Sequence, residues 1–493
     1  MRYVGFSEYY HDAALSIVNP DGTIEFASHA ERFSKRKNDS MIPDALWDYT
    51  DKNDHLSFYE KIAWKQTHRF DQRFNKVHLS KAERHEQIPV YESLAYDVDW
   101  EHHKSHCASA FYTRPWKDRE TTVMVSIDGV GEFQTATIYD HNFNLIKEWH
   151  YPKSVGLVYT TATKMLGLRA LEDEYVVMGL SSYGEAPEEI YGGLVNWYEH
   201  TPRINPRIQN EQVIDPEEGD PLFWEMRRMQ EDWVSRYSKE DFAAGIQKFA
   251  EWAIMQIMQD ASLHGRKLVY SGGCAQNVVT NSRLFELFEE VHIAVSPTDA
   301  GSSLGAAAMS WEKATGKDQL IWTPYLGYNI EREVNPRLVV DHLLEHKVCG
   351  LANGKAEFGP RALGNRSLIA DVRSDVQDTV NGIKRRQKYR PFAPAVLEEY
   401  AYKYFEGPMN EYMQYTSKAL HDYKSVTHVD GTARVQIVRK DCESVFRKVI
   451  EEYYERTGVP MLLNTSLNIR GRPMVNDEHD AELFEEKYGV KVF

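Results

Sequence analysis

Two histidines four residues apart are the first residues whose spacing indicates chemistry. In the segment EHHKSHCASAFY, His102 and His106 would project from one face of a helix, about one turn apart. Two helical histidines in that geometry can bind one metal ion, and they need acidic partners. Asp128, in an acidic glycine-rich turn, and Asp299, just before a run of small residues, are the candidates. The alternative is a pair of surface or core histidines, since the chain holds 19.

A basic stretch from Gly354 to Pro394 stands out against the rest of the chain. It holds nine cations and four anions, a local balance of +5 in a protein of net charge -16. The cations are Lys355, Arg361, Arg366, Arg373, Lys384, Arg385, Arg386, Lys388 and Arg390. Arginines beside Gly-Pro and Gly-Asn turns suit a pocket that binds phosphate or carboxylate oxygens. The alternative is a solvated basic face. Because the arginines alternate with apolar residues, we favour a packed anion site.

Length and composition limit the class of protein. At 493 residues with 42% hydrophobic and 27% charged content, the chain is expected to form two to four soluble domains. No run of about 18 apolar residues predicts a membrane span, and the N-terminal sequence lacks a signal peptide's apolar core. Four cysteines without C-x-x-C spacing favour a cytoplasmic location. The acidic net charge argues against tight nucleic-acid binding.

Two segments repeat one local design. Residues 1–18 are predicted to form two strands around a polar turn that carries His11 and Asp12, and residues 121–139 two strands around the turn of Asp128. His11 and Asp12 could also be a simple turn stabilised by the aspartate side chain. Two such units indicate an internal duplication. The actin/hexokinase/Hsp70-like nucleotide-binding fold is built in this way, with phosphates held between the two turns.

Glycine-rich strand ends mark further ligand positions. Residues 267–284 are predicted to form a buried strand that ends in Ser-Gly-Gly and enters a helix, and residues 295–311 follow the same pattern. Such ends allow the main chain to approach a ligand, and helix N-termini favour anions. Residues 428–438 and 460–475 are predicted strand–turn elements with polar residues at the strand ends.

The remaining segments indicate how the chain is divided. Residues 154–184 are predicted to form an amphipathic helix followed by an apolar turn bounded by glycines. Residues 185–240 are acidic and resemble an insertion or variable subdomain, in which we find no chemistry. Residues 312–350 are expected to cross into a second domain.

Nine segments together resemble the ATP-dependent O-carbamoyltransferases of nodulation factors, cephems and aminoglycoside antibiotics. They are HHKSH, SIDGVGE, VMGLSSYG, SGGCAQN, SPTDAGSSLGAA, EFGPRALGNRSLIAD, IKRRQKYRPFAPAVL, HVDGTARVQ and LLNTSLN. The resemblance implies an α/β protein. Residues 1–330 would be an actin/Hsp70-like duplicated nucleotide-binding domain that transfers the carbamoyl group, with a variable insertion at about 185–240. Residues 331–493 would resemble the threonylcarbamoyl-adenylate synthase fold and form the adenylate.

The resemblance also implies a reaction in three steps. Carbamoyl phosphate is cleaved to carbamate and phosphate, and carbamate then attacks the α-phosphate of ATP, which gives carbamoyl adenylate and pyrophosphate. In the N-terminal domain an acceptor hydroxyl attacks the carbamoyl carbon and releases AMP. Adenylate formation crowds negative charge and needs fixed cations, whereas transfer needs a polarised electrophile and an oriented hydroxyl.

Site residues are carried over from the resemblance by matching motifs. Catalytic matches are His11, Arg361, Arg366, Lys384 and Arg390. Nucleotide- and substrate-binding matches are Gly129, Gly272, Gly273, Asn277, Arg434, Asn464 and Ser466. Metal matches are His102, His106, Asp128 and Asp299, which imply Fe(II) or another divalent metal, while ATP would bring Mg(II). His11 is the candidate general base or acceptor-orienting group.

Two departures from the family pattern bear on specificity. Val176 stands where the pattern often has lysine, and Gln276 where it usually has leucine. The acceptor is expected to be a small molecule with a hydroxyl, such as a sugar, a natural product or a hydroxymethylated nucleotide, and the protein a possible homodimer. The competing hypotheses are a threonylcarbamoyl-type tRNA-modifying enzyme, which a tRNA-binding assay at physiological salt would distinguish, and a non-catalytic nucleotide-binding protein.

Overall fold

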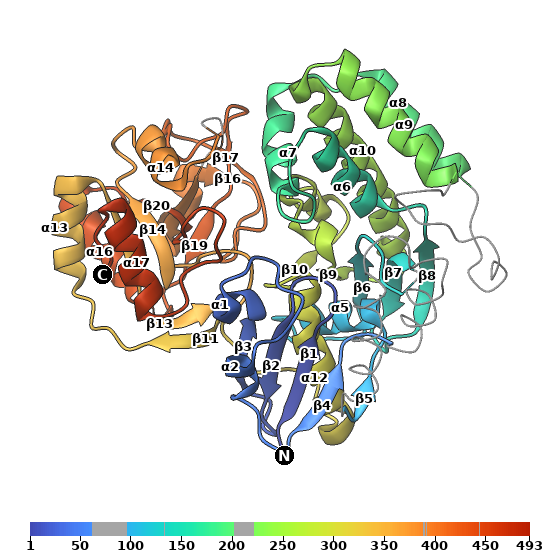
Figure 1. The fold of residues 1–493 in the computed structure, drawn as a ribbon, viewed down its shortest axis with the longest axis horizontal. Coiled ribbons are helices and arrows are strands. Elements are labelled where there is room, and N and C mark those ends of the chain that lie inside the picture. The colour runs from blue at the N-terminus through green and yellow to red at the C-terminus, as the bar shows by residue number, and fades with distance from the viewer. Residues whose placement is uncertain (62–95, 133, 202–220, 388–389, 391, 443) are drawn as a thin grey trace, which may run out of the picture.

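The first of two equivalent five-stranded sheets begins at the N-terminus (Figure 1). The computed structural model describes residues 1–61, 96–132, 134–201, 221–387, 390, 392–442 and 444–493. The sheet has the order β3-β2-β1-β4-β5. Its strands are β1 (Tyr3–Ser7), β2 (Ala14–Val18), β3 (Ile24–His29), β4 (His55–Phe58) and β5 (Val98–Asp99). The pairs β1–β2 and β2–β3 are antiparallel, whereas β1–β4 and β4–β5 are parallel. The short helices α1 (Ala30–Ser34) and α2 (Asp44–Trp47) connect β3 to β4.

The second sheet repeats this topology and confirms the predicted duplication. Its order, β8-β7-β6-β9-β10, has the same sequence of antiparallel and parallel pairs. The strands are β6 (Thr122–Ile127), β7 (Gln134–Asp140), β8 (Leu145–His150), β9 (Lys267–Ser271) and β10 (Glu290–Ile293). The predicted strand–turn–strand units are the hairpins β1–β2 and β6–β7. This part of the chain therefore has the duplicated α/β architecture of the actin-like fold.

Each sheet is followed by one helix, and the two helices pack against each other. They are α5 (His102–Phe111) and α12 (Asp299–Thr315). A Cβ atom at Gly305 would lie 1.8 Å from the carbonyl oxygen of Ser105 on α5, and one at Gly5 would lie 1.9 Å from that of Ser303. Only small side chains allow α12 to lie this close to both α5 and β1. The packing brings the first turns of both helices, with His102, His106 and Asp299, to one place.

The other helices of this half form a group beside the second sheet (Figure 1). They are α6 (Val155–Met165), α7 (Glu174–Leu180), α8 (Glu188–His200), α9 (Pro221–Arg236), α10 (Lys239–Ser262) and α11 (Val278–Asn281). Helix α10 packs against β6, while α8 and α9 pack on α10 and α6. The predicted amphipathic helix is α6. The apolar turn expected after it is instead largely helical, because Val176, Val177 and Leu180 lie at helical spacing and are buried. The expected insertion, 185–240, contains α8 and α9, and its residues 202–220 lie outside the described residues.

A third, mixed sheet forms the core of the C-terminal part, with the order β12-β14-β20-β15-β19. Its strands are β12 (Val348–Ala352), β14 (Arg366–Ala370), β15 (Ala393–Leu397), β19 (Gln436–Val438) and β20 (Met461–Ser466). The helices are α13 (Pro336–His346), α14 (Gln377–Lys384), α15 (Ala401–Tyr404), α16 (Val445–Thr457) and α17 (Glu478–Tyr488). The predicted strand–turn elements near 428–438 and 460–475 contain β19 and β20.

Small sheets join and extend these parts. Strand β11 (Tyr325–Ile330) pairs with β13 (Gly354–Glu357), so we propose the domain division at 330/331 as the point after this connecting strand. A three-stranded sheet contains β16 (Phe405–Glu406), β17 (Ser417–Ala419) and β18 (Thr432–Ala433). Within the described ranges, no helix has the length and apolar character needed to cross a membrane.

Candidate functional site

Helix α5 presents His102 and His106 on one side, as their spacing predicts. The helix begins at His102, whose main-chain N–H donates to Glu132 Oε1 over 2.9 Å. The same oxygen accepts the N–H of Lys61 over 3.0 Å. Glu132 therefore satisfies one of the free N–H groups of the first helical turn and holds that turn in place. His102 and His106 are both buried.

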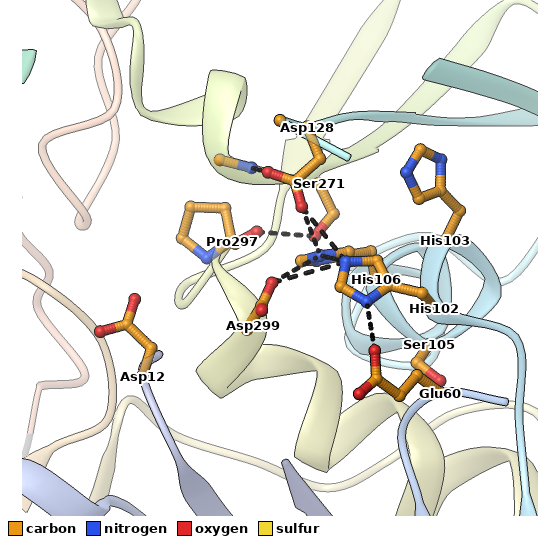
Figure 2. Close-up of polar contacts among 12 residues, drawn as sticks. Asp12, Glu60, His102, His103, Ser105, His106, Asp128, Ser271, Pro297 and Asp299 are labelled. Carbon is orange, nitrogen blue, oxygen red and sulfur yellow. Dashed lines mark hydrogen bonds and ion pairs between the residues drawn. The ribbon is translucent and has the colours of Figure 1, made fainter. Parts of the chain in front are cut away.

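Four side chains converge on one point in this half of the protein (Figure 2). The Nε2 atoms of His102 and His106 lie 3.1 Å apart. Asp128 Oδ2 lies 3.2 Å from the first of them and 3.3 Å from the second. Asp299 Oδ1 lies 3.5 Å from the first and 3.3 Å from the second. The structure thus brings together all four residues that the sequence analysis assigned to a metal. We call these four residues the donor cluster.

The spacing of these donors matches a metal coordination shell. Metal bonds of about 2.1 Å to nitrogen and oxygen place neighbouring donors about 3.0 to 3.4 Å apart, depending on the angle between the bonds. These five separations, 3.1 to 3.5 Å, fall in or next to this range. Two imidazole nitrogens facing each other at 3.1 Å also require a cation or a shared proton between them. The residues therefore fit a divalent metal ion.

Electrostatics keep the two carboxyl groups in the form that binds metals. Burial raises the pKa of Asp128, but its contacts with His102 and His106 outweigh burial and bring that pKa well below its ordinary value. Burial likewise raises the pKa of Asp299, and the His102 and His11 imidazoles more than offset it, so this pKa is also lowered. Both carboxyl groups are thus ionised, as metal ligands must be.

The glycine turn after β9 holds Asp128 in position. The N–H of Gly273 donates to Asp128 Oδ1 over 3.1 Å. Gly272 has a φ of 93°, and a Cβ atom there would lie 2.3 Å from the carbonyl oxygen of Ile127. The expectation that both glycines line a nucleotide pocket stays a prediction. Their observed contacts are with the strand and turn that carry Asp128.

We expect Gly273→Ala to weaken metal binding by about 10- to 100-fold, because the new Cβ would lie 2.8 Å from Asp128 Oδ1 and displace the carboxylate. The measurement is a metal titration against a chromophoric chelator. Gly129→Ala is the matched control, since a Cβ atom there meets only Leu157 Cδ2 at 3.9 Å. Equal affinities for the two variants would show that Gly273 does not position Asp128.

His11 lies at the edge of the donor cluster. Its Nε2 atom is 4.0 Å from Asp299 Oδ2, and its Nδ1 atom is 3.6 Å from Asp12 Oδ2. Burial lowers the pKa of His11, but the carboxylates of Asp299 and Asp12 more than reverse this and raise it to about 9. The side chain of His11 is 22% exposed, compared with 17% for Asp128 and 3% for Asp299. With this raised pKa, His11 is protonated at neutral pH, so the role of general base needs its neutral form and stays a prediction.

Asn277 has a different immediate role from the one expected. Its Oδ1 atom accepts the N–H of Thr280 over 3.1 Å and so caps α11. Its amide also exchanges hydrogen bonds with the side chain of Gln247 over 3.0 and 3.2 Å. The side chain therefore fixes the helix behind the glycine turn. A nucleotide contact of Asn277 remains a prediction.

Cations that repel one another gather in the C-terminal half. They are Arg361, Lys384, Arg386, Arg390 and Arg434, and we call them the cation cluster. Burial lowers the pKa of Arg361 to about 10, and repulsion by Arg390 adds to the effect. Burial and repulsion by three neighbouring arginines bring the pKa of Arg434 well below its ordinary value. Within the described residues no ion pair involves Arg361, Lys384, Arg390 or Arg434, so a bound anion would relieve this repulsion.

Lys384 contacts the end of β20 and the loop that follows it. Its Nζ atom donates to the carbonyl oxygen of Ser466 over 2.6 Å, to Ser466 Oγ over 3.1 Å, and to Asn468 Oδ1. Burial lowers its pKa well below the ordinary value, and repulsion by Arg386, Arg390 and Lys37 lowers it further. The lysine is thus held rigidly at the edge of the cation cluster.

Arg366 does not lie with the other cations. Its three guanidinium nitrogens donate to the main-chain carbonyl oxygens of Tyr328, Asn353, Gly354, Asn365 and Asn476. The side chain is fully buried. With its N–H groups used in this way, Arg366 ties the start of β14 to three distant segments. We therefore propose a positioning role for Arg366 in place of the phosphate contact expected from the sequence.

Asn464 also supports the loop that carries Arg361. Its Nδ2 atom donates to the carbonyl oxygen of Ala362 over 3.1 Å and to Gln436 Oε1 over 2.7 Å. Glu357 Oε1 accepts the N–H groups of Leu363, Asn365 and Arg366 from the other side. The Arg361 loop is therefore fixed by hydrogen bonds although the Arg361 side chain has none to the described residues.

One residue beside the cation cluster was missed by sequence reasoning, whereas Arg386 was named with the basic stretch but not as a site residue. Tyr175 comes from α7 in the N-terminal half, and its ring lies 4.4 Å from the guanidinium carbon of Arg390. No sequence pattern links Tyr175 to a segment more than 200 residues away. The cation cluster is thus closed by a residue from the other half.

The two sites lie near one contact between the halves. A Cβ atom at Gly359 would lie 2.6 Å from the carbonyl oxygen of Val295, four residues before Asp299. Phe358 is buried against the ring of His29, 5.4 Å away. Arg361 follows Gly359 by two residues. The segment that leads into the cation cluster therefore packs on the loop that leads into the donor cluster.

The duplicated α/β half, the four metal-type donors and the cation cluster together define an enzyme. The family model "Carbamoyltransferase N-terminus" matches residues 58–308, and "Carbamoyltransferase C-terminus" matches residues 340–492. The chain belongs to the carbamoyltransferase family, and the protein is a carbamoyl-transferring enzyme.

Named relatives extend over most of the chain. Nodulation protein NolNO of Sinorhizobium fredii is 30% identical over 96% of this chain and 76% of its own. An uncharacterised protein of Synechocystis is 28% identical over 97% of this chain and 93% of its own. Among solved structures, the activator of 2-hydroxyisocaproyl-CoA dehydratase from Clostridium difficile aligns with 64% of this chain and 96% of its own, at 14% identity and a TM-score of 0.35.

Proposed function

We propose that the protein is an ATP-dependent O-carbamoyltransferase that forms carbamoyl adenylate at the cation cluster and transfers the carbamoyl group at the donor cluster. The observation that carries the proposal is the pairing of two unlike sites in one carbamoyl-transferring enzyme. One site gathers buried cations that repel one another, and the other gathers two imidazoles and two carboxylates. The first suits reactants rich in phosphate, and the second suits a metal ion.

Adenylate formation is assigned to the cation cluster. Carbamoyl phosphate and ATP bring several phosphate groups together, and fixed guanidinium and ammonium groups stabilise such charge without reorganising during the reaction. Cleavage of carbamoyl phosphate by water gives carbamate and phosphate. A carbamate oxygen then bonds to the α-phosphorus of ATP as pyrophosphate leaves. Arg361, Arg390 and Arg434 would bind the phosphates, and Lys384 would bind oxygens beside Ser466.

Transfer is assigned to the donor cluster. His102, His106, Asp128 and Asp299 would hold a divalent metal, for which we propose Fe(II), and a metal bound there supplies Lewis-acid polarisation. His11 lies at the edge of the cluster, and its neutral form would accept the proton of the acceptor hydroxyl. A metal bound at Asp299 would favour that neutral form, because it would offset the carboxylate charge that raises the pKa of His11. The hydroxyl oxygen bonds to the carbamoyl carbon as the bond to the AMP oxygen breaks. The products are the O-carbamate and AMP.

The acceptor is proposed to be a small molecule with a free hydroxyl group. A sugar or another natural product would offer such a hydroxyl. A hydroxymethylated nucleotide stays a candidate of the same chemistry. Mass spectrometry of candidate compounds incubated with carbamoyl phosphate and ATP would identify the acceptor by the added carbamoyl group.

The phosphorus-containing products of the reaction test the proposed function. With an acceptor, ³¹P NMR should show phosphate, pyrophosphate and AMP accumulating in equal amounts. Formation of ADP in place of AMP would contradict adenylate chemistry. Omission of carbamoyl phosphate is the control, and it should stop the release of pyrophosphate.

Removal of the metal should separate the two steps. Treatment with 2,2′-bipyridine, with Mg(II) in excess, is expected to abolish transfer to the acceptor while leaving pyrophosphate exchange into ATP within about twofold of the untreated protein. The reason is that the cation cluster contains none of the four metal-type donors. Readdition of Fe(II) should restore transfer. Equal loss of exchange would show that the two sites are not independent.

A further inference from the structure

A buried glutamate stands directly behind one of the metal-type donors. Glu60 is 1% exposed, and its Oε2 atom lies 3.6 Å from His102 Nδ1, on the side of the ring away from the donor cluster (Figure 2). His102 Nδ1 is itself buried and has no hydrogen-bond partner at this distance. The reaction as proposed above gives Glu60 no part.

The main chain on both sides of Glu60 is tied to the donor cluster. The carbonyl oxygen of Tyr59 accepts Ser105 Oγ, from α5 itself, over 2.7 Å. The N–H of Lys61 donates to Glu132 Oε1, the same atom that accepts the N–H of His102. Glu60 is therefore fixed relative to the first turn of α5 by residues that hold α5.

The contact has the form of an outer-shell carboxylate. Histidines that bind metals through one ring nitrogen generally donate from the other to a carboxylate or carbonyl, which fixes the tautomer and the orientation of the ring. His102 Nε2 points at Asp128, Asp299 and His106, so its Nδ1–H is the group left to donate. A shift of a few tenths of an ångström would turn the 3.6 Å contact into a hydrogen bond.

We propose that Glu60 is a positioning residue that holds the His102 imidazole with its proton on Nδ1 and its Nε2 lone pair directed at the metal. The inference rests on the proposed metal site. Among the described residues, His106 Nδ1 has neither a hydrogen-bond partner nor a carboxylate within 4.0 Å, so Glu60 distinguishes the two histidines. His102 is thereby the more strongly oriented ligand.

The test compares metal affinity, which does not depend on catalysis. Metal-free wild type, Glu60→Gln and Glu101→Gln are titrated with Co(II) against a chromophoric chelator. Glu60→Gln should raise the dissociation constant about 10- to 100-fold, because the amide cannot hold the imidazole proton as a carboxylate does. Glu101→Gln is the matched control, since Glu101 precedes His102 but pairs with Lys104 over 3.0 Å, and it should match wild type.

The outcomes separate this inference from the proposed function. An affinity of Glu60→Gln within about twofold of wild type would overturn the role of Glu60 while leaving the metal site in place. A wild-type protein that binds no Co(II) would overturn the metal site and Glu60 with it. If Glu60→Gln does not fold, Glu60→Asp keeps the carboxylate at a longer distance and should bind Co(II) with intermediate affinity. An affinity equal to wild type would then contradict the role.

Discussion

Arg361→Ala is expected to lower carbamoyl-phosphate-dependent exchange of labelled pyrophosphate into ATP by on the order of 10²- to 10³-fold, because it removes a fixed charge from the site of adenylate formation. Its guanidinium group has no hydrogen bond or ion pair with the described residues, and its pKa is lowered by burial. The variant should therefore fold as stably as wild type. Exchange assays with thermal melts measure both effects.

Lys355→Ala is the matched control for Arg361. Lys355 belongs to the same basic stretch, but it is exposed and its Nζ atom contacts the carbonyl oxygen of Glu25 over 3.3 Å. Its variant should exchange pyrophosphate as wild type does. Lys384→Ala should also lose exchange. It removes hydrogen bonds to Ser466 and Asn468 as well, so its loss of exchange would not separate a missing charge from a displaced loop. Full exchange by Arg361→Ala would remove Arg361 from the proposed site.

His106→Ala is expected to abolish transfer to the acceptor while sparing pyrophosphate exchange. Removing one of four donors should release the metal and lower transfer by on the order of 10³-fold, which corresponds to the loss of about 4 kcal/mol of transition-state stabilisation. The side chain is fully buried, and its Nε2 atom contacts both Asp128 and Asp299. Acceptor carbamoylation by mass spectrometry and exchange in the same samples are the two measurements.

His103→Gln is the control on the same helix. His103 is buried beside His106 but contacts Thr137 Oγ1 over 3.0 Å and takes no part in the donor cluster. This variant should keep the metal and both partial reactions, apart from a modest loss of stability. If His106→Ala and Arg361→Ala lost exchange equally, the assignment of two separate sites would be wrong.

The donor cluster could be predicted from the sequence because its determinants are local. A spacing of four places His102 and His106 on one helical face, and small residues allow α12 to bring Asp299 beside them. The duplicated hairpins were visible for the same reason, since each is a short pattern of apolar strands around a polar turn.

The hydrogen-bond partners of single charged residues could not be predicted, because these partners lie far away in the sequence. Arg361 and Arg366 stand five positions apart in one motif, yet Arg361 has no described partner and Arg366 donates only to main-chain carbonyls. The acceptors of Arg366 include Tyr328 and Asn476, which are far apart in the sequence. Glu60 and Tyr175 were missed because tertiary packing alone places them at their sites.

The central claim is that this carbamoyl-transferring enzyme works through an adenylate, and one measurement addresses it most directly. Purified wild-type protein with Mg(II), ATP and labelled pyrophosphate should incorporate label into ATP only when carbamoyl phosphate is added, because reversal of adenylate formation requires the carbamoyl group. Folded protein that transfers a carbamoyl group to an acceptor but shows no such exchange would contradict the account.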